Sequence, residues 1–151
     1  MTGVAVFERT LQKANIWLKD IGLELGVDNK EQCLVYLRAV LHALRDRLPL
    51  AEAVDLAAQL PIILRGIYFE GWVPLNGSSR ERTQEDFLHT VGRNLGPAIG
   101  FDLDVEAVTR AVLAVLSRHV SEGEMLDVLH GLPRQLRPLF QEWDNNLEAR
   151  L

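Results

Sequence analysis

An internal repeat constrains this chain more than any other feature of its sequence. The 33-residue stretch Arg38–Glu70 recurs 72 residues later as Arg110–Glu142, and 12 of the 33 positions are identical without gaps. Unrelated sequences of ordinary composition would share roughly two such positions. The recurring residues of the first copy are Arg38, Ala39, Val40, Leu41, Leu44, Glu52, Asp55, Leu60, Pro61, Leu64, Arg65 and Glu70. We therefore expect two similar halves.

Apolar spacing and capping residues predict helices throughout both halves, whereas strand patterns are nearly absent. In the first half the predicted helices span about residues 4–24, 28–48, 49–59 and 61–70, with Asp28 and Glu31 as a capping box. Pro49 and Pro61 begin the last two, because the first turn of a helix needs no amide donor.

In the second half Thr83 and Ser121 are the predicted caps, and a further helix is predicted over about residues 104–119. The fold predicted from these signals is all-α, with about eight helices in two duplicated four-helix halves related by a pseudo-twofold axis.

The length of 151 residues suits one domain that buries its own core. We expect a single all-helical domain over residues 1–151, built of two repeats at about 4–72 and 83–143. The Pro-, Gly- and Ser-containing segment 73–82 is the predicted linker between them.

Composition argues against several classes of function. A formal charge of −5 and a pI near 5.4 do not suit a nucleic-acid binder, which needs clustered basic residues. The sequence has no apolar run long enough for a membrane span and no secretory signal pattern, so we expect a cytoplasmic protein. Cys33 stands alone in an apolar stretch and is expected to be buried rather than reactive.

No grouping of residues indicates catalysis or a cofactor. The four histidines lack the close spacing of metal sites, and no nucleophile elbow or phosphate-binding glycine loop occurs. We therefore expect neither an enzyme, a metal nor a cofactor. An enzyme remains the third-ranked alternative.

The predicted helix at 61–70 differs from its copy on its outer face. Ile62, Ile63 and Phe69 stand where the second copy has Arg134, Gln135 and Gln141. A helix that is apolar nearly all round must be covered on more than one side. Either it lies at the centre of the protein, or Ile62, Ile63, Phe69 and Trp72 form an exposed patch for a second subunit or another protein. A membrane-surface role is a weaker third interpretation.

The corner Arg45-Asp46-Arg47 ends the helix that precedes Pro49. Basic residues at a helix C-terminus complement the helix dipole, so this corner is interpreted first as helix termination. The second interpretation makes Arg45 and Arg47 part of a contact surface that belongs to the first half alone, because the copy has Ser117 and His119 there.

Two duplicated charge pairs flank the Leu-Pro corners. Asp55 with Arg65, and Asp127 with Arg137, stand ten residues apart on consecutive predicted helices that must fold back at the proline. We expect them to form structural ion pairs that fix the angle of each corner. Rival partners for the two aspartates are the duplicated arginines at positions 38 and 110, and the alternative role is a ligand site between the halves.

Several specific segments resemble a known family. They are Trp17-Leu18-Lys19, the run from Arg38 to Pro49 that ends in Arg-Asp-Arg-Leu-Pro, the segment Ala57-Ala-Gln-Leu-Pro61, Arg65-Gly-Ile-Tyr68, and Gly71-Trp72. With them the chain, from about Phe7 to Phe140, resembles the prokaryotic family called domain of unknown function 2267. The resemblance implies a small, soluble, all-helical bacterial or archaeal protein with no assigned activity and no established catalytic residues to carry over.

The sequence thus favours a non-enzymatic helical interaction or scaffold protein, possibly a homodimer, that contacts its partner through the helix at 61–70. The alternative is a small-molecule or lipid binder with a cavity between the halves, lined by Trp17, Tyr68, Trp72 and the duplicated arginines.

Overall fold

The computed structural model describes residues 3–74, 80–97 and 102–140, and every regular secondary-structure element within these ranges is a helix. The all-α prediction is confirmed. The elements are α1 (Ala5–Leu25), α2 (Lys30–Arg47), α3 (Leu50–Ala57), α4 (Ile62–Phe69), α5 (Gln84–Leu95), α6 (Val105–His119), α7 (Glu122–Gly131) and the 3-10 helix η3 (Arg134–Leu139). Residues 75–79 of the predicted linker, and residues 98–101 and 141–143 of the predicted second repeat, lie outside the described ranges.

Side-chain caps begin α5, α6 and α7, and those at Thr83 and Ser121 are the predicted ones. The side chains of Thr83, Asp104 and Ser121 accept hydrogen bonds from amides three residues further on. The predicted cap of α2 was wrong by one residue, because Asn29 rather than Asp28 accepts from the amide of Gln32. A left-handed turn at Gly26 ends α1, and the amide of Val27 still binds the carbonyl of Gly22, so the next helix starts later.

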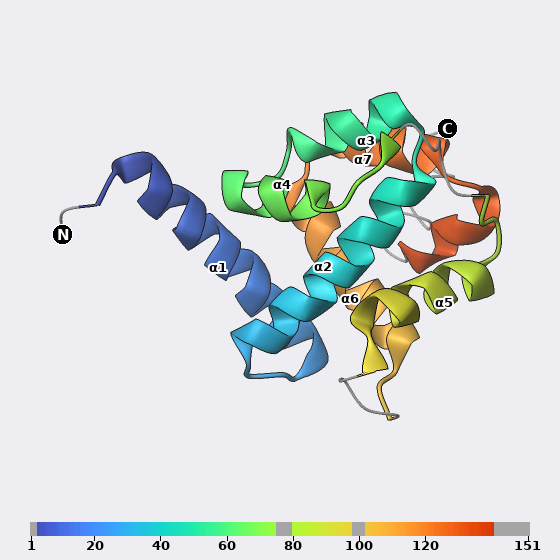
Figure 1. Cartoon of the computed structure of the whole chain (residues 1–151), viewed down its shortest axis with the longest axis horizontal. Helices are drawn as coiled ribbons and strands as arrows, with labels where there is room; N and C mark the ends of the chain where they lie inside the picture. The colour runs from blue at the N-terminus through green and yellow to red at the C-terminus, as the bar shows by residue number, and fades with distance from the viewer. Residues whose placement is uncertain (1–2, 75–79, 98–101, 141–151) are drawn as a thin grey trace.

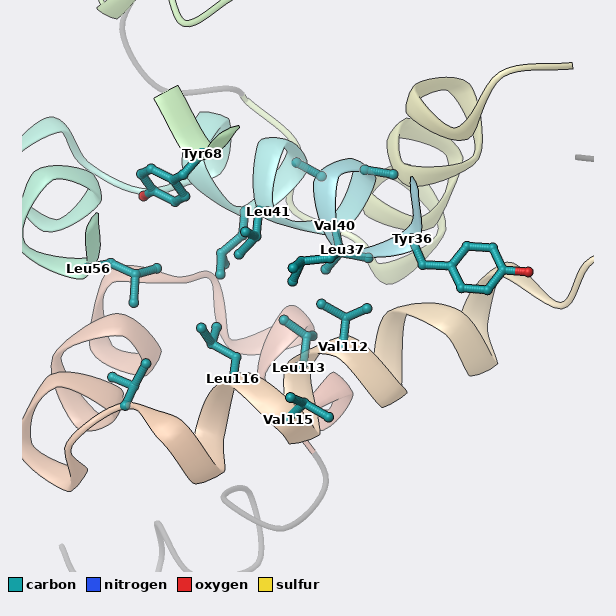
Figure 2. Packing of buried hydrophobic residues seen from close by; sticks show 14 of the residues in the cluster. Tyr36, Leu37, Val40, Leu41, Leu56, Tyr68, Val112, Leu113, Val115 and Leu116 are labelled. Carbon is teal, nitrogen blue, oxygen red and sulfur yellow. The ribbon is translucent and has the colours of Figure 1, made fainter. Parts of the chain in front are cut away.

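The core is centred on α2, which packs against α1, α4, α5 and α6. Figure 2 shows side chains of α2 and α6 facing one another, with Val40 and Leu41 opposite Val112 and Leu113. All four are fully buried, and burial of such a side chain is worth roughly 1.5–3 kcal/mol. These are equivalent positions of the two repeats, so the repeated sequence supplies both sides of the central contact.

The last helix of each repeat differs in type. Residues 62–69 form an α-helix, whereas residues 134–139 form a 3-10 helix that contains Pro138. Proline lacks an amide hydrogen and its ring clashes with the carbonyl four residues earlier, so it interrupts α-helical bonding. The first copy has Gly66 at this position, which leaves the α-helix intact.

The N-terminal half of α1 extends beyond the rest of the bundle (Figure 1). The buried residues of this helix begin only at Ala14 and continue with Trp17, Leu18 and Ile21. Phe7 and Leu11 lie on the same stripe, at steps of four and three residues, yet they are exposed. The apolar stripe of α1 therefore runs past the part of the helix that its own protein covers.

Candidate functional site

The outer face of α4 is only partly covered. Leu64 and Tyr68 are buried, but 55% of Ile62 and 40% of Ile63 are exposed. Phe69 and Trp72 are half-buried and stack with ring centroids 5.4 Å apart. The two interpretations of this helix therefore each describe part of it: one face belongs to the core, and its N-terminal end presents isoleucines to solvent.

Helix α1 brings further apolar side chains to this place. The hydroxyl of Thr10 accepts a hydrogen bond of 3.0 Å from the amide of Ile63. Phe7, 64% exposed, and Leu11, 49% exposed, lie within one turn of Thr10. We call Phe7, Leu11, Ile62 and Ile63 the α1–α4 surface. The heptad-like spacing of Phe7 and Leu11 with Ala14 and Leu18 was readable in the sequence, but the lack of a covering helix was not.

Arg45 does not belong to any exposed surface, contrary to the second of the two interpretations of this corner. Its side chain is only 5% exposed. The guanidinium donates to the carboxylate of Asp46 at 2.8 Å and to the carbonyl oxygens of Tyr68 and Glu70 at 2.8 and 2.7 Å. It therefore fastens the end of α2 to the end of α4, where the last carbonyl oxygens of the helix have no intrahelical donor.

Arg47 is likewise engaged within the protein. Its Nε donates to the carbonyl oxygen of Glu81, just before α5. Burial lowers the pKa of this guanidinium, and the neighbouring Arg82 lowers it further, while Glu81 opposes the shift. The predicted contact corner thus holds α2 to its neighbours in the first and second halves.

The expected ion pairs at the Leu-Pro corners are not formed. Arg65 instead donates to the carbonyl oxygens of Ala57, Ala58 and Leu60, at 3.0, 3.3 and 3.2 Å. Arg137 does the same at the second corner, with the carbonyls of Leu129 and Leu132. The last carbonyls of a helix lack intrahelical partners, and they compete successfully with the carboxylates for these guanidinium groups. The rival arginines bind elsewhere too: Arg38 pairs with Glu70, and Arg110 with Glu106.

The two aspartates belong to a group of four carboxylates where α3 packs on α7. It consists of the duplicated residues Glu52, Asp55, Glu124 and Asp127. Carboxylate oxygens of Glu52, Glu124 and Asp127 lie within 4.8 Å of one another, the arrangement that could hold a metal ion. The recurrence of Glu and Asp at one spacing in both repeats was the sequence signal for this group.

Protonation of Glu124 reduces the repulsion among the carboxylates of this group. Burial, together with the hydrogen bond to the Glu52 carboxyl and repulsion from Glu52, Asp55 and Asp127, raises the pKa of Glu124 to about 8. The Oε1 atoms of Glu52 and Glu124 are buried without a hydrogen-bond donor among the described residues. A proton on Glu124 supplies that donor, so the pair can share one proton.

A surface groove of about 480 Å³ lies between α1 and the corner that joins α3 to α4. Its lining includes Arg9, Lys13 and Trp17 from α1, and Ile62 and Arg65 from α4. Of the residues predicted to line a cavity, Trp17 and Arg65 are present. Tyr68 is fully buried, with its hydroxyl donating to the carbonyl of Ala53 at 2.7 Å, and Trp72 stacks on Phe69.

The helical fold and the repeated core positions define the class of the protein as a small all-α domain. Within that class, the chain belongs to the family of uncharacterised conserved proteins DUF2267, whose model matches residues 14–139. The comparison with curated proteins found no match. None of the described helices combines the length and the apolar character that crossing a bilayer requires.

Proposed function

We propose that this protein is a non-enzymatic interaction or scaffold protein that contacts another protein chain through the α1–α4 surface. The observation that carries the proposal is the exposure of four large apolar side chains from two helices joined by the Thr10–Ile63 hydrogen bond. Exposed apolar groups gathered within a polar rim are typical of protein contact sites.

The energetics of this surface favour a partner. Each covered side chain of this size would contribute roughly 1.5–3 kcal/mol before the costs of association. Phe7 and Leu11 lie on the stripe that α1 already uses against its own core, so a partner helix could pack on them as the core helices pack on Ala14 and Leu18. The partner is a second copy of the chain or a different protein.

Charge substitution on α4 tests this proposal. We expect Ile62→Glu/Ile63→Glu to abolish the contact, because two buried carboxylates would lack partners in the interface. Light scattering after size-exclusion chromatography measures a homodimer, and cross-linking with affinity capture from the native host measures another partner. The fold should be retained, since both side chains are exposed.

The matched control is Leu50→Glu/Val54→Glu on α3, where two apolar side chains are exposed to a similar degree, 56% and 47%. The control should keep the oligomeric state and the partners of the wild type. Equal behaviour of the two double variants, whether both bind or both fail, would contradict a contact centred on α4.

We also infer that the two halves derive from one duplicated unit and are packed about a pseudo-twofold axis. Three observations support this: Val40 and Leu41 pack on their equivalents in α6, Glu52 faces its equivalent Glu124, and Arg65 and Arg137 bind carbonyls at the same sequence separations.

The alternative function is that of a small-molecule or lipid binder with a site between the halves. The groove favours it, because its lining joins Arg9 and Arg65 of the first repeat to His119 of the second, beside the ring of Trp17.

A further inference from the structure

We propose that the groove between α1 and the α3–α4 corner binds a small anionic amphiphile, a carboxylate carried on an apolar chain. The carboxylate would lie at Arg9 and Lys13, and the chain along Ile16 and Ile62. The groove shares Ile62 with the proposed protein contact, but its cations Arg9 and Lys13 lie outside that contact, and the proposal does not depend on it.

The first argument is the charge of the groove. Its titratable lining residues are Arg9, Lys13, Arg65 and His119, and no Asp or Glu lines it, although the whole chain carries a net charge of −5. Arg65 keeps its positive charge while it donates to backbone carbonyls. Basic residues gathered at one place on an acidic protein indicate a ligand of opposite charge.

The second argument is that two of these cations have no counter-ion. Arg9 and Lys13 form no ion pair with any residue in the described ranges. They stand four residues apart on α1 and therefore lie on one face, where both can approach one carboxylate.

The acidic residues further along that face show the contrast. Asp20 pairs with His119 at 2.8 Å, and Glu24 pairs with Arg118, so α6 neutralises the C-terminal half of the face. The N-terminal half of this face of α1 carries the basic residues Arg9 and Lys13, and among the described residues no carboxylate pairs with them. The charges of α1 are thus matched within the protein at one end only.

The third argument is the apolar part of the lining. Ile16 is 50% exposed and Ile62 is 55% exposed, and both line the groove with Val6 and Leu60. Trp17 forms part of the wall and stacks on His119 with ring centroids 4.8 Å apart. A volume of about 480 Å³ lies in the range of small-ligand sites, roughly 300–1,000 Å³. An aliphatic chain would cover the two isoleucines.

The N-terminus of α4 adds to the attraction for an anion. Pro61 and Ile62 open this helix at the groove; its N-cap residue provides no side-chain cap, and among its first-turn amides that of Ile63 donates to Thr10. The amide groups of a helix N-terminus carry a partial positive charge.

Titration calorimetry with decanoate tests the proposal, with 1-decanol and decyltrimethylammonium as probes of equal chain length. We expect decanoate to bind at one site, at least about tenfold more tightly than either control, and to weaken as salt is added. Equal affinity for decanoate and decanol would overturn the role of Arg9 and Lys13.

Charge reversal locates the site. Arg9→Glu/Lys13→Glu should weaken decanoate binding at least about tenfold, and Ile62→Ser should weaken it as well. All three side chains are exposed, so circular dichroism should show an unchanged helix content. Retention of wild-type affinity in the double reversal would overturn the proposal.

The matched control is Lys19→Glu/Lys30→Glu, which makes the same change of charge at a second hollow, between α1 and the start of α2. It should bind decanoate as the wild type does. If the control loses as much decanoate affinity as Arg9→Glu/Lys13→Glu, the effect comes from the net charge of the protein. That result would contradict a site in the groove. The oligomeric state and protein partners of Arg9→Glu/Lys13→Glu report on the protein contact separately.

Discussion

Arg45 shows how one residue can define a corner in only one of the two copies of the repeated sequence. Three acceptors surround its guanidinium, two of them carbonyl oxygens at the end of α4. The equivalent position in the second repeat is Ser117, whose hydroxyl donates within its own helix to Leu113 at 2.7 Å. The longer side chain therefore joins two helices, whereas the shorter one only completes a helix.

Removal of this guanidinium should be costly. We expect Arg45→Met to lower the free energy of unfolding by about 2–4 kcal/mol, because the buried carbonyl of Tyr68 and the partly buried carbonyl of Glu70 lose their donor. Urea unfolding measures the loss. The control is Arg38→Met, which removes an exposed pair with Glu70, with side chains 42% and 52% exposed, and should cost below about 1 kcal/mol. Equal losses would contradict the role of the buried carbonyls.

At the scale of elements, apolar spacing and prolines predicted where most helices begin and end. The sequence could not predict what holds the corners, because carbonyl oxygens are present at every residue and leave no pattern. Asp55 and Arg65 both recur in the second copy, ten residues apart, and this recurrence suggested an ion pair. In the structure Arg65 instead donates to backbone carbonyl oxygens. Pro138 did carry a readable signal against an α-helix at residues 134–139.

The corner bonds lead to opposite expectations for the two members of the expected pair. Arg65→Met should lower the free energy of unfolding by about 1–3 kcal/mol, since its bonds to Ala57 and Leu60 are lost. Asp55→Ala should leave stability unchanged or raise it, because Asp55 repels the other carboxylates of its group. Thermal unfolding of both variants measures these changes in stability. A loss of stability in Asp55→Ala equal to that in Arg65→Met would support the Asp55–Arg65 ion pair instead.

At the scale of the whole molecule, the fold class followed from the sequence but the exposure of its surfaces did not. Whether a given apolar residue is covered depends on which helix packs beside it. Phe7 and Ile21 lie on the same apolar stripe of α1, yet Phe7 is exposed and Ile21 is buried. The groove was foreseen only through Trp17 and Arg65, because its cations Arg9 and Lys13 show no spacing that differs from an ordinary solvated face.

The contact between α3 and α7 should give the protein a pH-dependent stability. Between pH 4.5, the ordinary pKa of the group, and about 8, the folded protein holds a proton on Glu124 that the unfolded chain lacks. Stability from this group therefore falls as pH rises towards 8 and is recovered on acidification.

Glu124→Gln should remove that dependence. Above pH 8 the variant should be more stable than the wild type by about 1 kcal/mol, after allowance for solvent screening of this partly exposed group. Urea midpoints at several pH values measure it, with the exposed Glu85→Gln of α5 as control. A parallel pH profile for wild type and Glu124→Gln would refute the shared proton.

If a partner binds the exposed part of the α1 stripe, that stripe would couple partner binding to folding. A partner seated on Phe7 and Leu11 would lengthen the same hydrophobic column that anchors Leu18 and Ile21, without a hinge between them. Association energy would then add to the cooperativity of the native state by thermodynamic linkage. The occupied protein would melt at a higher temperature as one unit.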